Sequence, residues 1–176
     1  MTEQHVFVFD DHSDRDLYRS SRTQEQFLNT AIVQSDISGS FEEYLEVFDT
    51  FYADHIEVRS EAWEEPARGK ARVRSLLFNF LVQLHVIAEV GGLTVSVRET
   101  AIHGDAAGET HSAWTLDLVG AWGTTCTLRW RVLRKWSASR VVYEHHYDQE
   151  QIGGPMTFDD LRLSAATVAP GFRWPS

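Results

Sequence analysis

The residues best suited to chemistry lie in the segment VVYEHHYDQ at positions 141–149. This segment is predicted to be a strand, and the side chains of a strand point to its two faces in turn. Glu144, His146 and Asp148 are therefore expected on one face. If that face is enclosed, it is a candidate site for proton transfer, because imidazole exchanges protons near neutral pH. The other face has Tyr143, His145 and Tyr147.

The same segment also fits an exposed strand face or a dimer interface. In that case Glu144 pairs with Arg129 or Arg131 on the neighbouring strand. Burying three ionisable groups on one face costs several kcal/mol unless the groups are hydrogen-bonded. The residues alone leave both interpretations open.

The elements that must position this strand follow from hydrophobic periodicity. Helical spacing predicts one helix from Thr23 and a second from an N-cap at Ser40, with Tyr52 on its apolar stripe. A short strand, a loop and a long helix follow. The apolar residues then recur at every second position, which predicts four strands. We predict an α+β fold: a cone-shaped, strongly curved antiparallel sheet with the N-terminal helices packed on its concave face. The later elements are expected at 55–61, 70–85, 93–103, 109–119, 124–136 and 140–149.

Length and composition indicate one globular domain, because 176 residues with 43% hydrophobic content suit a single core. We expect an arm at 1–22, the domain at 23–163 with a last helix at 157–163, and a tail at 164–176. The formal net charge of −10 disfavours nucleic acid and anionic membranes as partners. No apolar run has the length of a membrane span and no signal-peptide pattern is present, so a cytoplasmic protein is predicted. Cys126 is the only cysteine and is expected at a buried strand position.

Cofactor motifs are absent from the sequence. It has no HxH, HExxH or CxxC spacing, and no GxGxxG or GxxxxGK motif. His145 and His146 point to opposite faces of a strand, so they cannot both bind one ion without distortion. No cofactor or metal is predicted, although a site made by His146 with Glu144, Asp148 or His111 is open geometrically.

Aromatic residues indicate a cavity. A curved sheet with helices over its mouth often encloses an apolar space that a few polar groups orient. Core packing is the usual role of such residues, and the cavity is the alternative. The expected lining is Tyr52, Trp63, Trp114 and Trp130.

The order of elements over 23–150 resembles the nuclear transport factor 2-like superfamily, which includes SnoaL-like polyketide cyclases and ketosteroid isomerases. The run TFYADHIEVRSEAWEEPARGK at 50–70 looks like the family's helix-end phrase, with Tyr52, Ala53 and Asp54 leading into the first strand and Gly69 closing the loop. The ending VVYEHHYDQ resembles the family's final strand. These motifs specify a fold far better than a reaction.

The resemblance also bears on individual residues. It places Ser60 and its neighbour Glu61 in the lining of the cavity, where ketosteroid isomerases have their base. Their other acid and tyrosine have no counterparts here. Steroid isomerisation by that mechanism is therefore not expected. SnoaL-like cyclases and limonene-epoxide hydrolases have an inward acid at the position of His146, but the hydrolases' arginine and second aspartate are missing near 111–114. Epoxide hydrolysis by that arrangement is not expected either.

The resemblance turns Glu144, His146 and Asp148 toward the cavity, whereas amphipathicity alone would turn the opposite face inward. It implies a cofactor-independent cyclase, isomerase, dehydratase or hydrolase acting on a hydrophobic small molecule. His146 would be the acid or base, and Glu144 or Asp148 would set its protonation. The alternative is a non-catalytic ligand-binding or assembly module. A homodimer through the sheet is expected in either case.

Overall fold

The computed structural model describes residues 21–34, 41–61, 63–104, 108–121 and 123–153. Residues 1–20 of the predicted arm at 1–22, the N-cap at Ser40, the helix at 157–163 and the tail at 164–176 lie outside these ranges. Ser21 and Arg22, the last two residues of the predicted arm, are helical. Within the described residues, no helix is long and apolar enough to cross a membrane.

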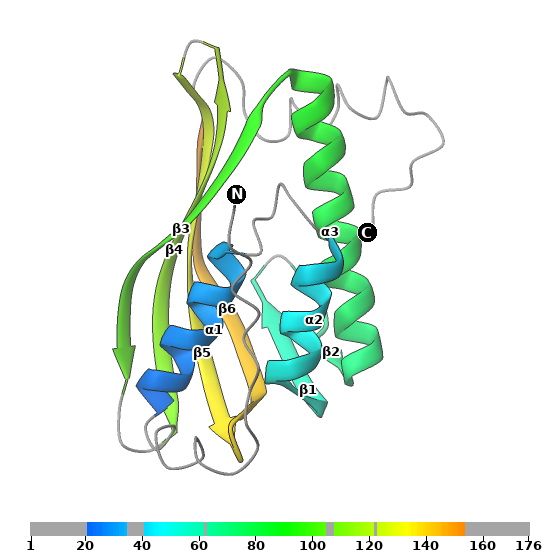
Figure 1. Ribbon diagram of the computed structural model, residues 1–176, viewed down its shortest axis with the longest axis vertical. Coiled ribbons are helices and arrows are strands. Elements are labelled where there is room, and N and C mark those ends of the chain that lie inside the picture. The colour runs from blue at the N-terminus through cyan, green and yellow to red at the C-terminus, as the bar shows by residue number, and fades with distance from the viewer. Residues whose placement is uncertain (1–20, 35–40, 62, 105–107, 122, 154–176) are drawn as a thin grey trace, which may run out of the picture.

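Three helices and six strands form two layers in the described chain (Figure 1). The strands make one open sheet in the order β2-β1-β6-β5-β4-β3, and the helices cover one of its faces. The elements are α1 (Ser21–Gln34), α2 (Phe41–Phe51), β1 (Tyr52–Ser60), β2 (Ala67–Arg68), α3 (Lys70–Gly91), β3 (Thr94–Gly104), β4 (Glu109–Gly120), β5 (Gly123–Ser137) and β6 (Arg140–Gly153).

The predicted α+β class and the four-strand antiparallel meander are confirmed. The sheet differs from the prediction in being mixed, because β1 runs parallel to β6. This pair joins the first and last long strands, so no local pattern could indicate its direction. The sheet is also not strongly curled, and is therefore flatter than the predicted cone.

Element ends differ from the prediction where two periodicities overlap. Tyr52 fits the helical stripe of α2, and its ring stacks on Phe48 with centroids 4.4 Å apart, yet it is the first residue of β1. The third helix extends to Gly91, and Gly92 ends it in the left-handed conformation with φ of 61°. The Gly92 cap supplies backbone N–H groups to the last turn, as in common helix C-caps.

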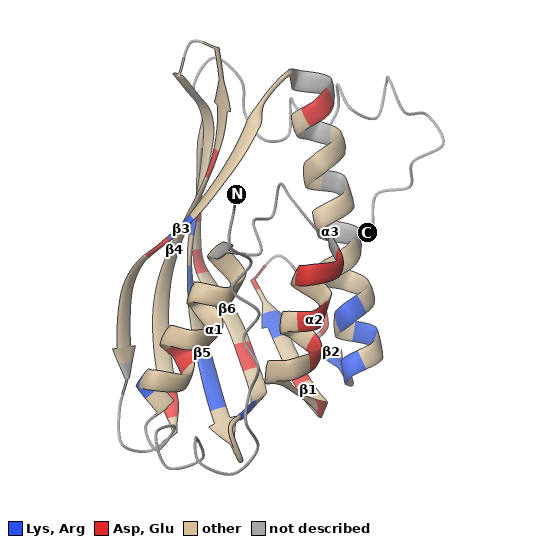
Figure 2. Cartoon of the chain, viewed as in Figure 1, with Lys and Arg blue, Asp and Glu red and all other residues tan. Residues whose placement is uncertain are grey.

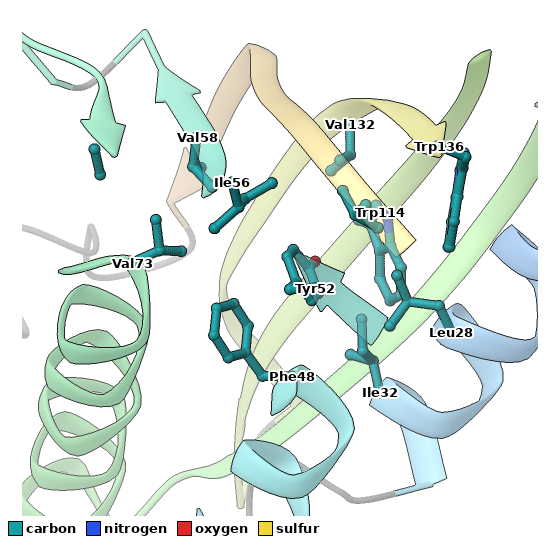
Figure 3. Close-up of a cluster of buried hydrophobic side chains, with 12 residues drawn as sticks. Leu28, Ile32, Phe48, Tyr52, Ile56, Val58, Val73, Trp114, Val132 and Trp136 are labelled. Atoms are coloured by element: carbon teal, nitrogen blue, oxygen red, sulfur yellow. The ribbon is translucent and has the colours of Figure 1, made fainter. Parts of the chain in front are cut away.

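The core lies between the helices and the inner face of the sheet (Figure 3). Alternation in β4 and β5 sends the large apolar side chains inward, where α1, α2 and α3 cover them. Cys126 is 1% exposed, so its predicted burial is confirmed. Buried members of the inner face are Trp114, Leu116, Leu118, Cys126, Val132 and Trp136.

Candidate active site

A cavity of about 580 Å³ lies between the helices and the inner face of the sheet. One part of its wall is apolar and comes from α3 and the middle of the sheet. The other part is polar and comes mainly from β1, α2 and β6. The apolar residues include Leu76, Leu77, Leu81, Leu116, Leu128 and Val132, and the polar ones include Tyr44, Ser60, Glu144, His146 and Gln149.

The inner face of β6 brings Glu144 and His146 to this cavity. Glu144 is 2% exposed, and its Oε1 lies 2.6 Å from His146 Nε2. The intervening His145 points to the outer face together with Tyr147, whose hydroxyl is 3.1 Å from His111 Nδ1. The orientation implied by the resemblance therefore holds for Glu144 and His146, and the one expected from amphipathicity alone does not.

The prediction that Asp148 shares this face is wrong. A β-bulge sets Asp148 and Gln149 of β6 opposite the single residue Trp130 of β5, and Asp148 has a φ of 51°. The extra residue reverses the alternation, so the Asp148 carboxylate lies 3.6 Å from Arg131 on the outer face. Gln149 takes the inner position and donates from Nε2 to Ser60 Oγ at 3.1 Å.

Arg134 of β5, which also lines the cavity and is 3% exposed, is the centre of a buried charge cluster. Arg134 Nε donates to Glu144 Oε2, and Nη1 donates to Oε1 of Glu25 in α1, both at 2.6 Å. Nη1 also donates to Asn29 Oδ1 at 2.8 Å. A single guanidinium thus joins the first helix to the last strand.

Sequence reasoning did not single out Glu25 or Arg134, although both positions carried a signal. Arg134 continues the inward alternation of Cys126, Leu128, Trp130 and Val132 on β5. Glu25 stands one helical turn before Leu28, on the face of α1 that is buried. A charged residue within an apolar stripe on each element indicates a buried pair once the elements are known to pack together.

The Glu144 carboxylate is fully engaged. Its Oε2 accepts from the Tyr52 hydroxyl at 2.5 Å as well as from Arg134, and its Oε1 faces His146. Glu144 therefore cannot also contact a ligand as a free base. Within the described residues, His146 Nδ1 has no hydrogen-bond partner, which leaves this nitrogen for a molecule in the cavity.

Protonation in the cluster follows from burial and the neighbouring charges. Burial raises the pKa of Glu144, but the Arg134 charge, His146 and the hydrogen bonds outweigh it and hold that pKa well below the usual range. Burial raises the pKa of Tyr52 and of Tyr44 above their ordinary value. At neutral pH Glu144 is thus an acceptor and both phenols keep their protons.

The other residues predicted to line the cavity do so with one exception. Trp63, Trp114, Trp130, Tyr52 and Ser60 all line the cavity, and the rings of Trp114 and Trp130 stack across β4 and β5 with centroids 6.2 Å apart. Glu61 is exposed after the end of β1 and does not line the cavity. Its carboxylate accepts from the Gln149 backbone N–H at 3.5 Å. Among the residues with described positions, no group of three His, Cys, Asp or Glu could hold a metal ion.

Comparison with solved structures identifies the fold. A nuclear transport factor 2-like protein from Anabaena variabilis superposes with a TM-score of 0.55 and 8% identity over 85% of this chain and 98% of that chain. A proposed SnoaL-like polyketide cyclase from Jannaschia sp. superposes with a TM-score of 0.52 and 9% identity, over 73% of this chain and 87% of that chain. A proposed ketosteroid isomerase from Kribbella flavida superposes with a TM-score of 0.51 and 13% identity, over 78% of this chain and 85% of that chain.

No protein-family model and no curated protein matches the sequence. At these identities the structural likeness establishes the fold alone. The activity of this chain must therefore be argued from its own cavity.

Proposed function

We propose that this protein, which has the nuclear transport factor 2-like fold, binds a hydrophobic small molecule in the cavity and transforms it by acid/base catalysis without a cofactor. The observation that carries the proposal is the placement of His146, which lines the cavity while a buried carboxylate holds its Nε2 at 2.6 Å. A histidine oriented by a carboxylate is the usual arrangement for a general base.

In this proposal His146 Nδ1 takes a proton from a carbon or oxygen of the ligand, and Glu144 stabilises the imidazolium that forms. The proton then returns to another atom of the same ligand or to a departing oxygen, so no oxidant or reductant is needed. Cyclisation, isomerisation and dehydration fit this scheme, and hydrolysis fits it if His146 takes the proton from a water molecule that attacks the ligand. The stacked Trp114 and Trp130 and the leucines of α3 favour a flat, ring-containing ligand.

Replacing His146 with glutamine is expected to lower turnover by about 10²–10⁴-fold, the usual contribution of one acid/base group. Binding should change little, because the apolar wall is intact. The matched control is His145→Gln, which alters the adjacent histidine on the outer face. Turnover is measured on a panel of polycyclic hydroxyketones and unsaturated ketones, and binding is measured with the neutral dye Nile red. Equal turnover by the two variants would contradict the proposal.

A non-catalytic binding or assembly module is the second candidate, and Ser60 favours it because a serine stands where the resemblance places the isomerase base. On this alternative, Nile red binds but the wild-type protein turns over no member of the panel. His146→Gln would then have no effect on any activity.

We also propose that two chains pair through the outer face of the sheet. Ion pairs between arginines and carboxylates lie on this face. They join Arg98 to Asp117 at 2.6 Å, Arg129 to Glu150 at 3.7 Å and Arg131 to Asp148 at 3.6 Å. The three arginine side chains are each more than half exposed. A patch that mixes both charges with Tyr147 and His111 can complement itself across a two-fold axis.

Light scattering at tens of micromolar is expected to give a mass near twice the 20.1 kDa of one chain. Arg131→Glu should shift the protein toward the monomer, because it adds a third negative charge beside Asp148 and Glu150. Arg72→Glu is the control, since Arg72 is exposed in the basic first turns of α3 (Figure 2). A monomer mass for the wild-type protein would refute the dimer.

A further inference from the structure

A buried chain of contacts runs from α1 through β5 to His146 in the cavity wall. Glu25 contacts Arg134, Arg134 contacts Glu144, and Glu144 contacts His146, and each of these three contacts is 2.6 Å long. The acid/base role proposed above uses only the last contact. It leaves unexplained why the first helix should contribute a fully buried carboxylate.

We infer that Glu25 is a positioning residue for His146, acting through Arg134 and Glu144. This inference rests on the proposed role of His146. Glu25 shares the Arg134 charge with Glu144, so Arg134 compensates only part of the Glu144 charge and Glu144 stays a strong acceptor for the His146 Nε2–H. Nδ1 of the same ring then stays directed to the ligand.

Burial shows that this arrangement is costly. Glu25 is 0% exposed and Arg134 3% exposed, and an apolar set of similar volume often stabilises a core at least as well as a buried ion pair. Packing of α1 on the sheet is already supplied by the buried Leu28 and Ile32. The charges at positions 25 and 134 are therefore not needed to attach the helix.

Glu25 is also held in one orientation. Its Oε2 accepts from the Thr110 hydroxyl at 2.8 Å, and its Oε1 accepts from Asn29 Nδ2 at 3.1 Å in addition to Arg134. All of these donors are buried. The carboxylate consequently keeps a fixed position relative to the guanidinium.

Charge balance gives the direction of the effect. Glu25, Arg134 and Glu144 together have one net negative charge when all are ionised, and Glu144 is the member that faces His146. Without the Glu25 charge, Arg134 and Glu144 would compensate each other. The hydrogen bond from the His146 Nε2–H to Glu144 would then weaken, since a charge-assisted bond depends on the charge left on its acceptor.

The test follows the Nε2 proton of His146 by NMR, with its signal assigned by comparison with His146→Gln. We expect this proton to exchange with water about tenfold faster in Glu25→Gln than in the wild-type protein, which corresponds to a bond weaker by about 1.4 kcal/mol. Gln24→Ala is the matched control. It removes another hydrogen bond of α1, from Gln24 Nε2 to Ser139 Oγ at 3.0 Å in the turn between β5 and β6, and leaves the residues of the charge cluster unchanged.

A variant that moves the negative charge to a neighbouring position separates the effect of the charge from that of the side-chain shape. The double variant E25Q/N29D moves the carboxylate one helical turn, to a position whose side-chain oxygen is 2.8 Å from Arg134 Nη1. It should restore slow exchange of the His146 proton, and restore folding if E25Q alone does not fold. The inference is overturned if E25Q exchanges like the wild-type protein, if Q24A accelerates exchange equally, or if the double variant restores nothing.

This result is independent of turnover. A His146→Gln variant with full activity would refute the catalytic role of His146 while the exchange data still reported its coupling to Glu25. Conversely, unchanged exchange in E25Q together with a large loss of turnover in H146Q would leave the proposed function and remove the role of Glu25.

Discussion

Replacing Arg134 with methionine is expected to lower the free energy of unfolding by about 3–5 kcal/mol, the usual cost of removing one partner from a buried ion pair. The variant keeps most of the side-chain volume and removes the charge. Glu25 and Glu144 would then face each other's charge in the core without the guanidinium that now contacts both at 2.6 Å. Urea denaturation followed by circular dichroism gives the change.

The matched control is Arg74→Met on α3, away from the proposed dimer interface. The Arg74 side chain is 44% exposed and its Nε lies 3.4 Å from Asp49 Oδ2, so this ion pair is expected to contribute at most about 1 kcal/mol. Adding E25Q and E144Q to R134M should recover part of the loss, because no buried charge is then left unpaired. Equal destabilisation by R134M and R74M would show that the buried cluster does not contribute as described.

Local patterns in the sequence predicted most elements of the fold, because each helix and meander strand has its own periodicity. The parallel pairing of β1 with β6 could not be predicted in this way. Tyr52 pairs with Val141 and Ser60 with His146, at sequence separations that no helical or strand pattern spans. Such pairings depend on the whole chain having folded.

The candidate site was predictable in part for the same reason. Glu144 and His146 share a strand face, so alternation was enough to place them together. Asp148 was misplaced because the bulge adds one residue, and aspartate tolerates the left-handed conformation that the bulge requires. Glu25 and Arg134 were missed because a charge on one element is read as solvated until its partner on another element is known.

Acid is expected to remove stability that Glu144 supplies at neutral pH. The pKa of Glu144 is lowered in the folded protein from an ordinary value of 4.5, since the charges and hydrogen bonds of Arg134, His146 and Tyr52 outweigh the effect of burial. The unfolded chain therefore takes up a proton at pH values where folded Glu144 stays ionised. The stabilisation is complete above about pH 4.5 and falls as the pH drops toward the lowered pKa, by about 1.4 kcal/mol for each unit.

Urea denaturation at a series of pH values from neutral to strongly acidic would check this expectation. The variant E144Q should be less stable at neutral pH, should lose stability less steeply than the wild-type protein below about pH 4.5, and should approach the wild-type curve in acid. Glu57 supplies the control: Arg59 and Arg68 also lower its pKa, but the ion pairs are exposed and screened by water. The free energy of unfolding of E57Q should therefore change with pH in the same way as that of the wild-type protein. If E144Q keeps the full acid dependence, Glu144 is not the carboxylate responsible, and the buried cluster does not hold it in the ionised form.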